Sequence, residues 1–275
     1  MNRNHATRFV RAAVTDALCL TGMPVVIGAQ WLDHRDARTP RRPDGSANLN
    51  APALRTADGK PDLSGVWQPA PDPTGTRGGI EGIIAPRYLV DITRDLKRED
   101  VPFQPAAAAL YQQRRDNSFR DNPLAGCLPA GVPRLDAYTH PYKIVQTPEL
   151  IVVLYESLTM FRQMFVDSRA LPMNPEPAWM GYSVGRWDGN ALVVETAGFN
   201  DKTWLDGSGH PHSEKMRLTE RFVRRDFGHM DIEITIDDPV MYTQPLRYTQ
   251  PQQLLPDTNL LEYVCDNLKE LPRTR

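Results

Sequence analysis

From residue 142 onward, the sequence consists of short β-branched and aromatic runs separated by turn sequences. Runs of this length and composition are typical of β-strands. Asp188-Gly189 lies between two of them, and an Asp-Gly pair is a strong signal for a two-residue hairpin. The expected strands are KIVQT, LIVVLYES, TMFRQMFVD, GYSVGRW, ALVVETAGF, EKMRLTERFVRR, MDIEITI and NLLEYVC.

Consecutive hairpins form an antiparallel meander. A meander this long must protect its two edge strands, and it can do so by curling or by closing on itself. The sequence therefore predicts a mainly β fold, an antiparallel meander that closes into a barrel or a strongly curved sheet, as in lipocalins. A flat two-sheet sandwich is the alternative.

The part of the chain before these runs contains one helical pattern. Residues 103–118, FQPAAAALYQQRRDNS, combine a run of alanines with a proline at a first-turn position, so we expect a helix there. The chain has 25 prolines, which favour long, ordered, non-helical connections. We expect a single β-rich domain over residues 61–270, with its strand-rich part at 142–267.

The first 60 residues have a different character. Arginines precede an apolar stretch that ends in small residues by position 29, which is the order of a secretory signal. Asp16 and Pro24 interrupt that stretch, so a disordered N-terminus is the alternative. Residues 30–60 are polar and proline-rich and resemble a linker. We therefore expect an exported protein, periplasmic or secreted, whose mature chain has no transmembrane span.

Charge and cysteine content narrow the choice of partners. The net charge of −2 over 275 residues gives no basic face, so we expect no nucleic-acid partner. No CxxC pair occurs among the three cysteines, which makes a thiolate zinc site unexpected. Cys127 and Cys265 can form one disulfide in an oxidising compartment, or remain as two buried thiols. Nothing in the sequence indicates an oligomeric state.

The densest polar segment is WLDGSGHPHSE, residues 204–214, directly before a long strand. Side chains alternate between the two faces of a strand. The apolar residues of this strand stand at even positions, and so do His212, Glu214 and Glu220. We therefore expect these three side chains to face the interior, where a buried carboxylate needs a cation, a metal, a hydrogen-bond network or a proton.

Three functions are open to this segment. His210, His212 and Glu214 can bind a divalent metal from alternate positions. Alternatively, His212 and Glu214 act as acid–base groups, supported by Asp206, His210 and Glu220. A third possibility is that these groups only orient a ligand.

Each residue of the segment also has an ordinary structural explanation. The histidines can be loop residues, Glu214 can cap a turn, and Glu220 can pair with Arg162 or Arg186. HEXXH and GXSXG patterns are absent, which removes the two most specific hydrolase signals.

A second polar group precedes the first clear strand. Tyrosine, histidine and arginine side chains commonly line small-molecule pockets and can bind anions. The alternative is ordinary packing at a barrel rim. With Trp204, the candidate ligand-binding residues are Arg134, Tyr138, His140 and Tyr142.

The strings PDLSGVWQ, CLPAGVPR, GRWDGNALVVETAGFND and WLDGSGHPHSE resemble those of a family of secreted bacterial proteins whose activity is uncharacterised. The resemblance implies export and a β-rich domain, but no catalytic residue.

The sequence favours an exported enzyme that transforms a small molecule by non-redox acid–base or metal-assisted chemistry in a barrel-end cavity. A lyase, an isomerase or a hydrolase would fit. No organic cofactor is required, and a divalent metal is the one optional cofactor. The alternatives are a periplasmic carrier for an apolar or aromatic ligand and an interaction module of the cell envelope.

Overall fold

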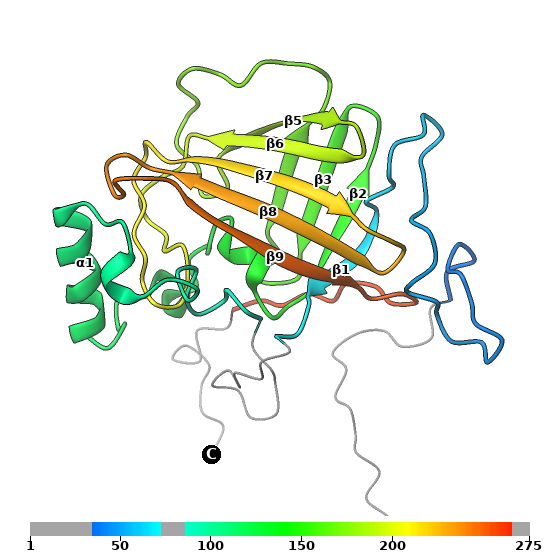
Figure 1. The fold of residues 1–275 in the computed structure, drawn as a ribbon, viewed down its shortest axis with the longest axis horizontal. Helices are drawn as coiled ribbons and strands as arrows, with labels where there is room; N and C mark the ends of the chain where they lie inside the picture. Colours follow the sequence, from blue (N-terminus) through cyan, green and yellow to red (C-terminus); the bar gives the residue numbers. More distant parts are fainter. Residues whose placement is uncertain (1–34, 73–85, 266–275) are drawn as a thin grey trace, which may run out of the picture.

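Residues 35–72 and 86–265 are described by a computed structural model, and within them nine strands form one closed barrel (Figure 1). The expected apolar segment at residues 1–29 lies outside the described residues. The strands are β1 Gly65–Pro69, β2 Tyr142–Gln146, β3 Leu150–Tyr155, β4 Phe161–Phe165, β5 Tyr182–Asp188, β6 Ala191–Ala197, β7 Arg217–Arg224, β8 His229–Asp237 and β9 Leu246–Leu254.

Neighbouring strands are antiparallel, except that β4 and β5 pair in parallel. β9 returns to pair with β1, which closes the barrel and leaves no free edge. The predicted mainly β fold that closes into a barrel is therefore confirmed, with one parallel pair in an otherwise antiparallel meander. Closure satisfies the backbone groups that an open sheet would expose.

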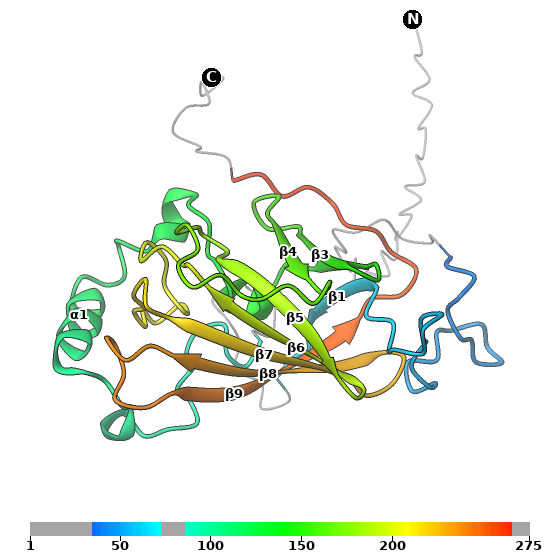
Figure 2. The same cartoon turned by 90° about the horizontal axis from the view of Figure 1, so that it is seen from above.

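One α-helix is present in the described part of the chain, α1 Pro105–Asp116, inside the expected range 103–118. Its proline is at the start of the helix, where no intrahelical donor is needed. Three short 3₁₀ helices accompany it, η1 Arg98–Asp100, η2 Pro123–Gly126 and η3 Arg134–Ala137. α1 lies beside one end of the barrel, near the loop that leads into β7 (Figures 1 and 2). Among the described residues, no helix has the length and the hydrophobicity that a membrane-spanning helix requires.

The last strand is not where the sequence predicts it. The segment NLLEYVC belongs to an irregular stretch, residues 255–265, whereas the closing strand is the polar sequence LRYTQPQQL. That strand directs Tyr248, Gln250 and Gln252 inward, so it lacks the apolar alternation that marks other strands. Pro251 also argues against a strand, because proline cannot donate to a ladder.

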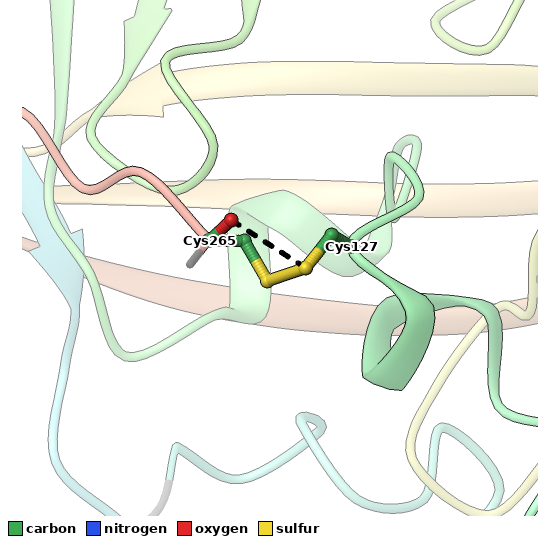
Figure 3. The surroundings of a disulfide bond; sticks show 2 residues. All are labelled: Cys127 and Cys265. Atoms are coloured by element: carbon green, nitrogen blue, oxygen red, sulfur yellow. Dashed lines mark hydrogen bonds between the residues drawn. A yellow bond between two sulfur atoms is a disulfide. The ribbon is translucent and has the colours of Figure 1, made fainter. Parts of the chain in front are cut away.

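A disulfide fixes this final stretch to the rest of the molecule. Cys127, which follows η2, lies with its sulfur 2.08 Å from the sulfur of Cys265, across 138 residues of sequence (Figure 3). Of the two possibilities left open by the sequence, the structure therefore contains the bridge. Residues 255–265 also bond to Glu156, whose backbone oxygen accepts from the Tyr263 amide at 3.2 Å.

Candidate functional site

The segment between β6 and β7 folds back on itself at one end of the barrel. The Leu205 amide donates to the His210 carbonyl at 2.9 Å, and Gly209 adopts a φ of +87°, which favours glycine. A side chain at Gly209 would also meet Arg114, whose Cδ lies 3.2 Å from the position of a Cβ. This tight turn buries the polar side chains of Asp206 and His210 completely.

The carboxylate of Asp206 is held by four hydrogen bonds. Its carboxylate accepts from the Ile92 amide at 2.8 Å, the Ser208 amide at 3.0 Å and the His210 amide at 3.1 Å. It also lies 2.6 Å from the Nδ1 of His210. These contacts compensate for the loss of water around a buried charge, and they fix the orientation of the imidazole.

His210 presents its other nitrogen to a hydroxyl. Its Nε2 lies 3.2 Å from the Oγ1 of Thr93, and the ring packs against both Tyr111 and Phe103, with centroid distances of 4.6 Å and 5.5 Å. The Thr93 hydroxyl donates to the Oδ1 of Asp91 at 2.8 Å. A carboxylate, an imidazole and a hydroxyl therefore stand in a row.

This row borders a pocket of about 450 Å³ between α1 and residues 91–103. Thr93 and Asp91 form one part of its lining, and Tyr111 forms another. His210 itself has no exposed surface, so a ligand in the pocket would meet the Thr93 hydroxyl first. The arrangement can move a proton between a hydroxyl at the pocket and a buried imidazole.

The same residues are the group within the described chain that could hold a metal ion. Single ligand atoms of Asp91, Asp206 and His210 lie within 4.8 Å of one another. Because Asp206 already accepts four hydrogen bonds, its role resembles that of a carboxylate orienting a ligating histidine. Asp91 and the Nε2 of His210 are the two groups best placed to ligate directly.

The two residues predicted as the main acid–base groups, His212 and Glu214, are not part of this row. Glu214 is exposed, in a turn at residues 214–215, so its expected inward orientation is wrong. The reason is that β7 begins only at Arg217, and strand alternation does not extend back to the turn. His212 is buried, but its Nε2 lies 2.6 Å from the Oγ1 of Thr203, and burial lowers its pKa. The expected metal set of His210, His212 and Glu214 is therefore not the group that the structure brings together.

Glu220 does face inward, as its position in β7 predicts. It forms a buried ion pair with Arg162, with Nη1 and Oε1 3.0 Å apart. Arg162 also donates to Ser183 and Thr196, at 3.1 Å and 2.9 Å. Of the two arginine partners proposed for Glu220, the structure contains Arg162. The ion pair connects β4 with β7 inside the barrel.

Asp136, on η3, is a further buried carboxylate. Its Oδ1 accepts from the Tyr155 hydroxyl at 2.7 Å, and burial together with the nearby Glu220 raises the pKa of Asp136 to about 8. Several buried polar atoms around it have no hydrogen-bond partner within the described residues. They are Asp136 Oδ2, Tyr142 OH, Tyr248 OH, Gln250 Oε1 and Gln252 Oε1.

The predicted ligand-binding residues are dispersed. Tyr142 points into the barrel, whereas Tyr138 and His140 stack on each other at 5.3 Å, and Tyr263 of the C-terminal stretch covers His140 at 4.4 Å. Arg134 is buried and donates to Asn122 at 3.1 Å. Trp204 is buried under the guanidinium of Arg114, which lies 4.8 Å from its ring centroid.

Sequence reasoning missed Asp91 and Thr93. They stand more than a hundred residues before Asp206 in a stretch, DITRD, that has no periodicity or motif. No local signal could have found them, because only the closed barrel brings residues 91–93 against the loop before β7.

In comparisons with known proteins, no family model matches the chain, and neither a curated protein nor a solved structure is significantly similar to it.

Proposed function

We propose that the protein is an exported hydrolase that cleaves small esters at the barrel end. His210 is the general base, Asp206 orients its ring, and Thr93 provides the nucleophilic hydroxyl. The single observation that carries the proposal is the row of Asp206, His210 and Thr93 beside a pocket. Carboxylate, imidazole and hydroxyl in this order activate nucleophiles on several unrelated folds.

The reaction follows from the order of the three groups. The Thr93 hydroxyl, which donates to Asp91 in the structure, first turns its proton to the Nε2 of His210. Nε2 then takes that proton while Oγ1 attacks the ester carbonyl carbon. The bond to the alcohol then breaks, and the imidazolium returns the proton to the departing oxygen. Water hydrolyses the acyl-threonine, with His210 taking one water proton and giving it back to Thr93. Ester and water thus become acid and alcohol, and the side chains are restored.

A metal-assisted version of this function would use Asp91 and His210 as ligands. Asp91 and His210 would hold a divalent ion beside Thr93, and the ion would polarise a substrate oxygen. The four hydrogen bonds to Asp206 favour the metal-free version, because they leave this carboxylate little capacity to ligate. Dialysis against a chelator distinguishes the two: lost activity that zinc or manganese restores supports the metal version.

The disulfide supports export. Disulfides persist in oxidising compartments such as the periplasm and are uncommon in the cytosol. The Cys127–Cys265 bridge is consistent with the secretory signal expected at residues 1–29.

The test measures hydrolysis of two substrates, 4-nitrophenyl acetate and 4-nitrophenyl hydrogen succinate, by variants of two histidines. His210→Asn should lower kcat/KM by about 100-fold or more, since removal of a general base has effects of this size. His229→Asn is the matched control, because His229 also contacts an aspartate but is partly exposed at the start of β8. It should change the rate less than about twofold.

Thr93 gives a second readout. Thr93→Val should abolish turnover, and Thr93→Ser should retain it. Equal losses in His210→Asn and His229→Asn would indicate non-specific hydrolysis by surface groups. That result, or no hydrolysis of either ester by the unmodified protein, would contradict the proposal.

A further inference from the structure

The pocket beside Thr93 carries more positive than negative charge. Arg94, Arg98 and Arg115 contribute to its lining, against one carboxylate, that of Asp91. Arg94 already forms a salt bridge, because its Nη1 lies 2.7 Å from an oxygen of Asp72. The charges of Arg98 and Arg115 are therefore the ones available to a ligand.

Neutral groups hold these two arginines in place. Arg98 donates to the side-chain oxygen of Gln112 at 2.6 Å. Arg115 lies over the ring of Tyr111, 5.7 Å from its centroid, and donates to the Tyr111 hydroxyl at 3.4 Å. Neither arginine forms a salt bridge within residues 35–72 and 86–265. Both side chains are exposed, and each contacts a neutral residue of α1, Gln112 or Tyr111, rather than a carboxylate.

Apart from Gln112 and Thr93, the rest of the pocket lining is apolar or aromatic. Leu96, Val101 and Phe103 line one side, and Ala108 and the ring of Tyr111 line the helix side. Apolar and aromatic walls accommodate a hydrophobic ligand body, while a few polar groups fix its orientation. The pocket therefore combines a hydrophobic wall, two guanidinium groups without a salt bridge in the described residues, and the Thr93 hydroxyl.

We propose that the substrate is a carboxylate-bearing ester with an aromatic or similarly apolar body. The ester part of this statement rests on the proposed function, whereas binding of the carboxylate does not. Guanidinium groups bind carboxylates through paired hydrogen bonds. Repulsion from Asp91 keeps the carboxylate away from the Thr93 end, so the acid group binds at Arg98 and Arg115 and the ester lies at Thr93.

The test measures binding without turnover. Benzoate and benzamide have the same aromatic body and differ in charge, so calorimetry of the full protein with each isolates the contribution of the carboxylate. At low salt, benzoate should bind about fivefold or more tightly than benzamide, as two partly exposed charge contacts would give. The preference should shrink at high salt because exposed charges are screened.

Three double variants test whether the preference belongs to the pocket. In Arg98→Gln/Arg115→Gln, benzoate and benzamide should bind equally, whereas the charge-preserving Arg98→Lys/Arg115→Lys should retain part of the preference. Arg217→Gln/Arg221→Gln on the outer face of β7 removes the same charge elsewhere and should retain all of it. Equal binding of the two probes to the unmodified protein, or a preference that survives Arg98→Gln/Arg115→Gln, would overturn the inference.

The two proposals fail separately. A benzoate preference that depends on Arg98 and Arg115, with no ester hydrolysis, supports the anionic ligand and contradicts the reaction. Hydrolysis that depends on His210, with no preference for benzoate, supports the reaction and contradicts the carboxylate. The acetate and succinate esters give a third readout, since the succinate ester should have the lower KM only while both arginines are present.

Discussion

The two ends of strand β7 each carry a histidine in contact with an aspartate. Before the strand, His210 Nδ1 lies 2.6 Å from Asp206, and both side chains are fully buried. After the strand, His229 Nδ1 lies 2.8 Å from Asp226, but the two side chains are 30% and 29% exposed. The contacts are nearly the same length, so the difference between the pairs lies in their surroundings.

Asp226 acts as the cap of a hairpin turn. It accepts from the backbone amides of Gly228 and His229, at 3.0 Å and 2.8 Å, which is an ordinary role for an aspartate in a turn. Asp206 also accepts backbone amides, but its histidine continues to Thr93 and a pocket. A histidine–aspartate contact is therefore a site candidate only where burial and a third group accompany it.

The strongest test of the importance of burial compares two ion pairs of the barrel. Glu220 and Arg162 are buried inside, whereas Glu195 and Arg186 are 39% and 67% exposed on the outer face. Glu220→Ala should lower the free energy of unfolding by about 3 to 5 kcal/mol, because Arg162 is left buried without its partner. Glu195→Ala should cost about 1 kcal/mol or less. Urea denaturation measures both, and similar losses would contradict the role given to burial.

The two aspartates give the next largest contrast. Asp206→Asn places an amide group where four N–H groups converge, so the free energy of unfolding should fall by about 3 kcal/mol. Asp226→Asn retains most of its turn contacts near solvent and should cost about 1 kcal/mol or less. Thermal unfolding of the two variants checks this, and a larger loss for Asp226→Asn would reverse the comparison.

Asp136 adds a pH dependence that belongs to the buried interior. Its pKa is raised to about 8 by burial and by Glu220, whereas an unfolded aspartate titrates near 3.9. The folded chain therefore retains a proton that the unfolded chain releases, and this contribution to stability is full below pH 4 and lost as pH rises through 8. The expected loss is roughly 2 to 3 kcal/mol between pH 5 and pH 7.

Asp136→Asn should remove that slope, because an amide does not titrate. Asp231→Asn, on the outer face of β8, is the control and should leave the slope unchanged. Denaturation midpoints at several pH values measure the slope, and an unaltered slope in Asp136→Asn would show that another group holds the proton.

The sequence was most informative where side-chain alternation is regular. The apolar alternation of MDIEITI predicts a strand because one face is buried in a hydrophobic interior. β9 could not be found in this way, since Gln250 and Gln252 occupy its inward positions. The parallel pairing of β4 and β5 also has no local signal, because it depends on the path of the connection after Phe165.

The candidate site was predictable only in part. The sequence placed Asp206 and His210 in one polar segment, but it assigned the leading roles to His212 and Glu214. Alternation was extended from β7 into a turn, where it has no physical basis. Thr93 completes the row from a distant loop, and proximity across the closed barrel cannot be read from one sequence.

The pairing of β1 with β9 also bears on how the chain reaches this structure. The barrel closes only when β1, near residue 67, pairs with β9, near residue 254. This pairing is therefore among the most non-local contacts of the fold. Folding that depends on such contacts is slow. Until β9 docks, β1 and β8 remain open edges that can pair with strands of other chains. The last strand therefore determines both the completion of the barrel and the period during which the chain is prone to aggregate.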